Sequence, residues 1–303
     1  MIHTSDIRIR DPFILAENGT YFLYAQGANR GGSGLSGVEV YTSRDLKNWD
    51  APRTVMVAPE GVTDVWAPEV HCHNGAYYLF VTFTFAETLG EPKPVDAPDW
   101  PPMRKRGTWV WRATTPLGPF EALREGPHTP PAWMALDGTL CVEDGVAGMV
   151  FCHEWVQLVD GTVNLVRLSD DLSAPAGEPV VLFKASDAPG ACSDAREGRV
   201  TDGPFLHKSP ATGRLFMIWS TFIQGSGYCV LQTQSQTGRV AGPWGCHKIL
   251  YSGDGGHGML FNDFQGRLLL ALHQPNHGAL ERMKLFEVRE TGAGLEITQE
   301  IKT

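Results

Sequence analysis

With 303 residues, 42% of them hydrophobic, the chain is long enough to bury a sizeable core. Its net charge of −9, with no basic cluster beyond Arg104-Lys105-Arg106, argues against a nucleic-acid partner, and no apolar stretch approaches the length of a membrane span. The six cysteines show no C-x-x-C spacing and are expected to be reduced and structural.

The N-terminal segment, MIHTSDIRIRDPF, has no apolar signal region and enters the first predicted strand almost at once. As written, the chain is therefore expected to be cytoplasmic. If a leader was trimmed from it, a periplasmic or secreted location is the alternative expectation.

One short pattern recurs five times: an acidic residue or a histidine, a nearby Gly or Pro, and then a run of apolar and aromatic residues. The five stretches read RDPFILAENGTYFLYA, WAPEVHCHNGAYYLFVTF, ALDGTLCVEDGVAGMVFCHEW, TDGPFLHKSPATGRLFMIWS and GGHGMLFNDFQGRLLLALH. Each predicts two strands joined by a tight turn such as Asn18-Gly19. The leading polar residues, spaced 58, 68, 65 and 55 positions apart, are Asp11, Glu69, Asp137, Asp202 and His257.

A repeat of this length in an all-strand chain predicts radial blades, and five repeats predict an all-β, five-bladed β-propeller with four strands in each blade. The polar residues lead the first strand of each blade, so symmetry would gather them at one end of a central channel. No linker divides the chain, and residues 1–303 are predicted to form a single catalytic domain. The least strand-like stretch, residues 86–107, is predicted to be a long loop over one mouth of the channel.

In their order these motifs resemble glycoside hydrolase family 43, five-bladed propellers that hydrolyse arabinose- and xylose-containing glycans with inversion. The resemblance runs from Arg10 to about Leu285 and rests on RDPF, WAPE, an Asp before a strand, an acidic-Gly-Pro element and Gly-His-Gly. It implies that Asp11 is the general base and that Asp137 tunes the acid and orients the substrate. The family usually has Glu as the general acid, whereas the matching position here is Asp202.

These residue types suit the chemistry of glycoside hydrolysis. An inverting enzyme needs one carboxylate to activate water and one carboxylic acid to protonate the leaving oxygen. A third carboxylate beside the acid raises its pKa by like-charge repulsion and keeps it protonated near neutral pH. The structural alternative for each Asp is a turn residue at the end of a strand.

The general acid has two candidates. Asp202 is one methylene shorter than the usual Glu, so its carboxyl falls short unless the backbone compensates. Glu154, in Cys152-His153-Glu154-Trp155 on the predicted second strand of the third blade, is the alternative acid, and its structural alternative is an outward-facing solvated residue. We rank Asp202 above Glu154.

Other side chains are candidates for binding sugar or metal. A flat apolar surface for a sugar ring is offered by four aromatic residues that are equally compatible with packing between blades: Trp66, Phe85, Trp155 and Trp219. Glu69 and His257 complete the predicted substrate-binding set. In many relatives the histidine matching His257 lies near the axis and binds calcium, so the resemblance implies a structural calcium ion there. Calcium prefers oxygen ligands, which makes a lone histidine a weak metal signal, and no cofactor is expected to be required.

The predicted function is an exo-acting, inverting hydrolase that releases arabinofuranose or xylose from plant-type glycans or their oligosaccharides. A carbohydrate is the expected partner. The alternatives are a carbohydrate-binding propeller with impaired catalysis, favoured only by the Asp at position 202, and activity on another furanoside such as galactofuranose. An interaction scaffold is disfavoured because scaffolds have no need for carboxylates clustered in a channel.

Overall fold

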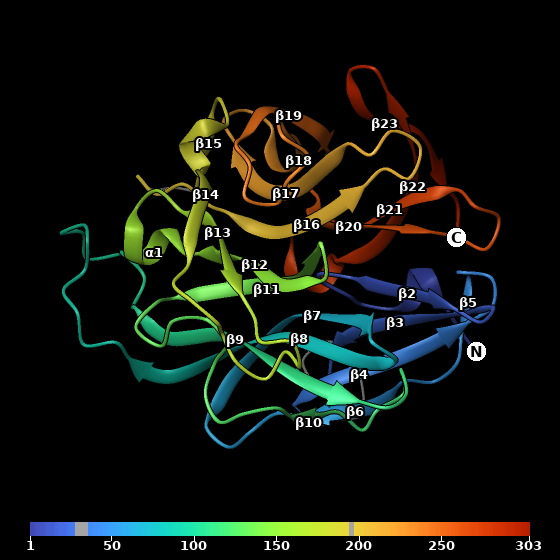
Figure 1. Cartoon of the computed structure of the whole chain (residues 1–303), viewed down its shortest axis with the longest axis horizontal. Coiled ribbons are helices and arrows are strands. Elements are labelled where there is room, and N and C mark those ends of the chain that lie inside the picture. The colour runs from blue at the N-terminus through green and yellow to red at the C-terminus, as the bar shows by residue number, and fades with distance from the viewer. Residues whose placement is uncertain (28–35, 194–196) are drawn as a thin grey trace.

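The computed structural model describes residues 1–27, 36–193 and 197–303, and it shows five antiparallel sheets arranged around a central axis (Figure 1). The prediction of an all-β, five-bladed propeller is confirmed. None of the helices in these three ranges is long and apolar enough to cross a membrane.

The chain builds the blades one after another, with the inner strand of each blade nearest the axis. The inner strands are β2 (Phe13–Glu17), β7 (Val62–His73), β11 (Ala135–Glu143), β16 (Asp202–Lys208) and β20 (Gly256–Asn262). Next come β3 (Thr20–Gln26), β8 (Ala76–Thr88), β12 (Val146–His153), β17 (Leu215–Ile223) and β21 (Leu268–Gln274). Third are β4 (Gly37–Ser43), β9 (Arg104–Ala113), β13 (Thr162–Arg167), β18 (Gly227–Ser235) and β22 (Arg282–Thr291).

The outer strands are less regular. They are β5 (Asn48–Trp49), β6 (Arg53–Val57), β10 (Glu121–Ala122), β14 (Val180–Lys184), β19 (Trp244–Ser252) and β23 (Gly294–Ile301). The first sheet also contains β1 (Ile2–His3), and β15 (Ala191–Cys192) joins the fourth sheet, so in the described chain these sheets have six and five strands instead of the predicted four.

The tight turns that join the inner strand of a blade to its second strand form as the sequence predicts. Asn18, Asn74 and Asp144 all have positive φ, and the glycine that follows each of them does too. The flanking residues pair directly, as Glu17 does with Thr20, so each turn is a two-residue hairpin with left-handed backbone at both positions.

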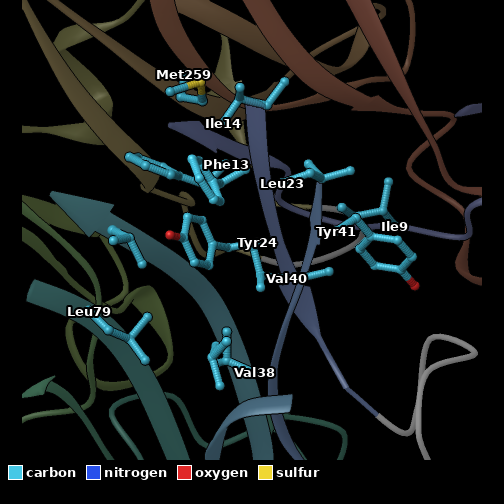
Figure 2. Close-up of a cluster of buried hydrophobic side chains, with 14 of the residues drawn as sticks. Ile9, Phe13, Ile14, Leu23, Tyr24, Val38, Val40, Tyr41, Leu79 and Met259 are labelled. Atoms are coloured by element: carbon cyan, nitrogen blue, oxygen red, sulfur yellow. The ribbon is translucent and has the colours of Figure 1, made fainter. Parts of the chain in front are cut away.

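Contacts between the first and last blades close the propeller. The backbone N–H of Ile9 donates to the carbonyl of Glu281 at 3.3 Å, and Arg8 forms an isolated bridge with Arg282. Apolar side chains fill the spaces between blades. Figure 2 shows one such cluster, in which Phe13 and Tyr24 of the first blade, Leu79 of the second and Met259 of the fifth are buried together.

The long loop of the second blade is shorter than predicted. Strands β8 and β9 extend into the stretch expected to be irregular, which leaves residues 89–103 as the loop. Trp100 of this loop is buried beside Trp155, and its indole N–H donates to the carbonyl of Val156 at 2.8 Å. The loop therefore supports the short helix α1 (Trp155–Leu158) and does not contribute to the lining of the cavity described below.

Candidate active site

One cavity of about 420 Å³ brings together the three carboxylates expected at the channel mouth, Asp11, Asp137 and Asp202. His257 and the alternative acid Glu154 also line it. These side chains come from the first, third, fourth and fifth blades, so the cavity exists only once the propeller has closed.

Left-handed backbone at the start of, or within, each inner strand positions the site. In the second to fifth blades the strand register shifts at this point, whereas in the first blade the point precedes β2, which pairs with β3 without a shift. The residue at each point has positive φ and is followed by Pro or Gly: Asp11-Pro12, Ala67-Pro68, Asp137-Gly138, Gly203-Pro204 and His257-Gly258. Left-handed backbone is uncommon in non-glycine residues, and it concentrates at functional sites. The fivefold symmetry therefore places Ala67 and Gly203, not Glu69 and Asp202, at the positions equivalent to Asp11.

Local packing and hydrogen bonding explain why Pro or Gly follows each of these residues with positive φ. A Cβ on Gly138 would lie 2.6 Å from the sulfur of Met149, and one on Gly258 would lie 2.8 Å from a methyl group of Leu270. The next strand thus packs too closely for a side chain. A proline at this position has no N–H, which suits a point where the ladder of hydrogen bonds shifts its register.

Asp11 is a buried carboxylate that lies close to one arginine and two histidines. One of its oxygens, Oδ1, lies 3.4 Å from Nδ1 of His257 and 3.6 Å from Nε of Arg10. Burial would raise the pKa of Asp11, but the interactions with His257, Arg10 and His273 outweigh burial and hold this pKa well below its usual range. Asp11 is therefore ionised throughout the neutral range, as a general base requires.

Asp202 has the opposite tendency. Its Oδ2 accepts a hydrogen bond from the hydroxyl of Tyr228 at 2.9 Å. Burial and the neighbouring charge of Asp137 raise the pKa of Asp202 to about 7, against the opposing effects of His257 and Tyr228. Asp202 therefore retains a proton near neutral pH and can donate it.

Asp137 lies between these two groups. Its Oδ2 accepts the backbone N–H of Gly203 at 3.0 Å and lies 3.6 Å from Nδ1 of His257. Burial and the charge of Asp11 raise the pKa of Asp137 well above its usual value. Because Asp137 is hydrogen-bonded to the residue that follows Asp202, it holds the fourth-blade bulge in place, and it also raises the pKa of Asp202.

Glu154 differs from its predicted place. It precedes helix α1 as the N-cap residue and does not lie on a strand. Its carboxylate forms an ion pair with Arg106, whose guanidinium lies over the ring of Trp66 at 4.1 Å. Burial raises the pKa of Glu154 and Arg106 opposes this rise. The carboxylate, which lines the cavity, is thus paired with a buried cation behind the lining.

The predicted substrate-binding residues divide into two groups. Trp66 and Trp155 line the cavity, as His257 does. Glu69 is buried and bonded to His71 at 2.9 Å, and it does not line the cavity.

Phe85 and Trp219 lie away from the cavity. Phe85 lines a separate groove beside Lys105 and Trp109, because alternation along β8 directs it to the face opposite Thr84. Trp219 is fully buried between blades, and the centroid of its ring lies 5.3 Å from that of Phe183.

The sequence prediction missed one residue of the cavity lining, Arg10, and two residues that bind lining side chains from outside the lining, Arg106 and Tyr228. Arg10 lines the cavity, and its guanidinium donates hydrogen bonds to Oδ1 of Asn276 at 2.7 Å and to Oε1 of Glu281 at 2.8 Å. Its position next to Asp11 in the RDPF motif was the signal that could have identified it. Arg106 and Tyr228 gave no such signal, because only the strand pairing shows which side chains they reach.

The predicted calcium ligand, His257, is surrounded by carboxylates. Its Nδ1 faces oxygens of Asp11 and Asp137, and its backbone N–H donates to Oγ of Ser220 at 2.9 Å. The described part of the chain contains no group of three or more His, Cys, Asp or Glu that could hold a metal ion. This donor set does not match the six to eight oxygen ligands that calcium takes. Calcium at the axis stays a prediction.

We expect Gly203→Ala to lower the free energy of unfolding by about 1–3 kcal/mol, because φ is +51° and the new Cβ would lie 2.8 Å from the ring of His257. Gly213→Ala is the matched control, since φ there is +72° with no atom within 4 Å. Urea unfolding of both variants measures the difference. Equal losses would show that the contact with His257 places no constraint on position 203.

Comparisons with known proteins agree with this geometry. The family model described as glycosyl hydrolases family 43 matches residues 4–293. A solved structure described as an endo-arabinase from Bacteroides thetaiotaomicron is 34% identical, covers 97% of this chain and 99% of its own, and superposes with a TM-score of 0.83. An extracellular exo-α-(1→5)-L-arabinofuranosidase, ArbA from Cellvibrio japonicus, is 21% identical over 95% of this chain and 85% of that protein.

A further solved structure extends the likeness of fold. It is described as an exo-1,5-α-L-arabinanase from a bovine ruminal metagenomic library, is 19% identical with a TM-score of 0.68, and the match covers 99% of each chain. The match of the family model over nearly the whole chain, together with the carboxylates in one cavity, assigns the molecule: this chain belongs to glycosyl hydrolase family 43 and is a glycosidase.

Proposed function

We propose that this glycosidase hydrolyses arabinofuranosyl linkages with inversion, with Asp11 as general base, Asp202 as general acid and Asp137 as the group that tunes the acid. The choice of sugar is supported by the printed names of two similar proteins, the endo-arabinase and the exo-α-(1→5)-L-arabinofuranosidase. Xylosides and galactofuranosides are the alternative substrates.

The observation that carries this proposal is the opposite shift of two carboxylic acids in one cavity. The pKa of Asp11 lies well below its usual range and the pKa of Asp202 is raised to about 7. A pair of titratable groups whose environments separate their pKa values has the arrangement that acid–base catalysis needs.

The proposed reaction is a single displacement. Asp11 accepts a proton from water while the water oxygen forms a bond to the anomeric carbon, and the bond from that carbon to the leaving oxygen breaks. Asp202 gives its proton to the leaving oxygen, so the products are a free sugar and an alcohol. Attack on the face opposite the leaving group inverts the configuration. Asp202 then regains a proton as Asp11 loses one to solvent.

The test is hydrolysis of linear α-1,5-arabinan, arabino-oligosaccharides and nitrophenyl glycosides of arabinofuranose, xylose and galactofuranose. NMR of the first product formed gives the anomeric configuration, and we expect inversion at an arabinofuranosyl linkage. Retention, or turnover of the other glycosides alone, would contradict the proposal. The Asp at position 202 favours a second candidate, a carbohydrate-binding propeller, which calorimetry would show as glycan binding without turnover.

Exo action has less support than the sequence suggested. The loop expected to close the pocket packs against helix α1, and the similar solved structure is described as an endo-arabinase. The products of linear arabinan decide between the two modes. Release of monosaccharide or a single oligosaccharide from the start indicates exo action, whereas a ladder of lengths indicates endo action.

The location can be tested separately. One relative is named as extracellular, which supports a secreted or periplasmic enzyme, whereas the sequence as written favoured the cytoplasm. We propose the secreted or periplasmic location, and fractionation of the native host with an antibody to this protein would show it. Recovery only in the cytoplasmic fraction would reject it.

The pH dependence of kcat/KM follows from the two carboxyl groups. Activity needs Asp11 ionised, which holds above its lowered pKa, and Asp202 protonated, which holds below about 7. We therefore expect kcat/KM on an arabino-oligosaccharide to be high in mildly acidic buffer and to fall as the pH rises through about 7. An activity that keeps rising above pH 8 would contradict this pairing of roles.

A further inference from the structure

Tyr228 is a buried group in contact with the proposed acid, and it has no role in the proposed displacement. It lies on β18 and is 1% exposed. Its hydroxyl donates to Oδ2 of Asp202 at 2.9 Å, which links the third strand of the fourth blade to the start of its inner strand.

The ring of Tyr228 is held from several sides. It lies nearly parallel to the ring of His273, with centroids 5.9 Å apart and an interplanar angle of 24°, and contacts Phe222 at 5.0 Å. Gly256 leaves the space that the ring fills, because a Cβ there would lie 2.3 Å from Cε1 of Tyr228. The hydroxyl is therefore presented to Asp202 in one position.

From this geometry we propose that Tyr228 is the positioning residue of the general acid: it fixes the short carboxyl of Asp202 and leaves Oδ1 as the oxygen that delivers the proton. The proposal rests on the assignment of Asp202 as the acid. Because Asp is one methylene shorter than Glu, its carboxyl needs a fixed partner to reach a defined place in the cavity. Tyr228 supplies this partner from the third strand of the same blade.

The charges around the pair determine the direction of the expected effects. The titratable and charged groups that face Asp202 and Tyr228 from the surrounding elements are Arg10, Asp11, Asp137, Cys152, His257 and His273. Burial and the charge of Asp202 raise the pKa of Tyr228 well above its usual value, so the phenol stays a donor at every working pH. Its hydrogen bond favours the ionised form of Asp202, and removing it raises the pKa of Asp202.

The first test does not depend on turnover. In protein labelled with ¹³C at aspartate carboxyls, the signal of Asp202 is assigned by its loss in Asp202→Asn and then titrated in wild type and in Tyr228→Phe. We expect a higher pKa for Asp202 in Tyr228→Phe. The control is Tyr24→Phe, which removes another buried hydroxyl, bonded to the carbonyl of Pro116 at 2.7 Å, and should leave the titration of Asp202 unchanged. An unchanged pKa in Tyr228→Phe overturns the proposal.

The second test uses the leaving group. Without its anchor the acid should protonate a sugar leaving group poorly, so Tyr228→Phe should lower kcat on an arabino-oligosaccharide by about tenfold or more and change kcat on a nitrophenyl glycoside much less. The upper limb of the pH profile should move to higher pH. Equal losses on both substrates with an unchanged pH profile would mean that Tyr228 only supports packing.

A double-mutant cycle separates this inference from the proposed function. If Tyr228 acts through Asp202, Tyr228→Phe should have little further effect on kcat in the Asp202→Asn background. Additive losses would overturn the proposal for Tyr228. If wild type hydrolyses none of the glycosides but the pKa of Asp202 still rises in Tyr228→Phe, the proposed function fails and the role of Tyr228 in holding the carboxyl stands. Thermal melting of Tyr228→Phe and Tyr24→Phe confirms that both variants are folded.

Discussion

Asp11→Asn is expected to remove nearly all hydrolysis while leaving sugar binding largely intact. Asn keeps the shape of Asp11 but cannot take a proton from water, and the loss of a general base typically lowers kcat by about 10²–10⁴-fold. The surroundings of Asp11 strengthen this expectation, because His257 and Arg10 keep its carboxylate charged and correctly placed beside the cavity. Steady-state kinetics on an arabino-oligosaccharide measures the loss, and calorimetry with the same ligand measures binding.

The control for Asp11→Asn is Asp170→Asn, the same chemical change at an exposed position of the third blade. It should leave both kcat and binding unaltered. Retention of more than about a tenth of wild-type turnover in Asp11→Asn would reject Asp11 as the base, because a loss that small is below the range for general-base catalysis. Asp11 would then have a structural role in the backbone that leads into β2.

The fold could be predicted from the sequence because its signals are local and repeat. Each hairpin turn, such as Asn74-Gly75, is specified by residues that tolerate positive φ, and the apolar runs beside the turns form the inner strands. Five such units in one chain leave few arrangements other than a propeller. The extra strands β1, β6 and β15 were missed because strands of two to five residues at a sheet edge have no distinctive periodicity.

The site was predictable only in part. Asp11 and Asp137 could be predicted because each belongs to a short motif, in which Pro12 or Gly138 comes next. Both residues have positive φ in the structure. The roles of more distant groups depend on pairing between strands, which no local pattern encodes. Tyr228 reaches Asp202 across two strands, and Arg106 reaches Glu154 from another blade.

Aromatic residues gave the weakest prediction. A tryptophan inside an apolar strand has the same sequence signal whether it faces a cavity or a neighbouring blade. A shift of one residue along the strand moves the side chain from one face of the sheet to the other. Trp66 lies on the cavity side of the second blade, whereas Phe85 lies on the other side of the same sheet. Only the register of β7 against β8 distinguishes these two outcomes.

Asp202→Asn should show a strong dependence on the leaving group. A general acid matters most when the leaving group is another sugar and much less when it is nitrophenolate, which departs without a proton. We therefore expect kcat to fall by about 10²–10⁴-fold on an arabino-oligosaccharide and far less on a nitrophenyl arabinofuranoside. Kinetics on both substrates with the same enzyme preparation gives the ratio directly.

Glu154→Gln is the matched control for this prediction, since Glu154 lines the same cavity and is the alternative acid. Its carboxylate is bound to Arg106, so we expect its replacement to affect both substrates alike, through the cavity wall and not through proton transfer. If Asp202→Asn slows both substrates equally while Glu154→Gln shows the dependence on the leaving group, Glu154 is the acid and Asp202 is a residue of the strand end.

Asp202→Glu decides whether the structure has compensated for the shorter side chain. The family usually has Glu here, so in an uncompensated site this variant would gain activity. Asp202, however, is already bonded to a hydroxyl that cannot move, because Gly256, Phe222 and His273 enclose the ring of Tyr228. An extra methylene would displace the carboxyl from this partner, and a displacement of about 1 Å can lower the rate by about a hundredfold. We therefore expect Asp202→Glu to lose activity on an arabino-oligosaccharide, and a gain would show that the contact with Tyr228 does not set the position of the acid.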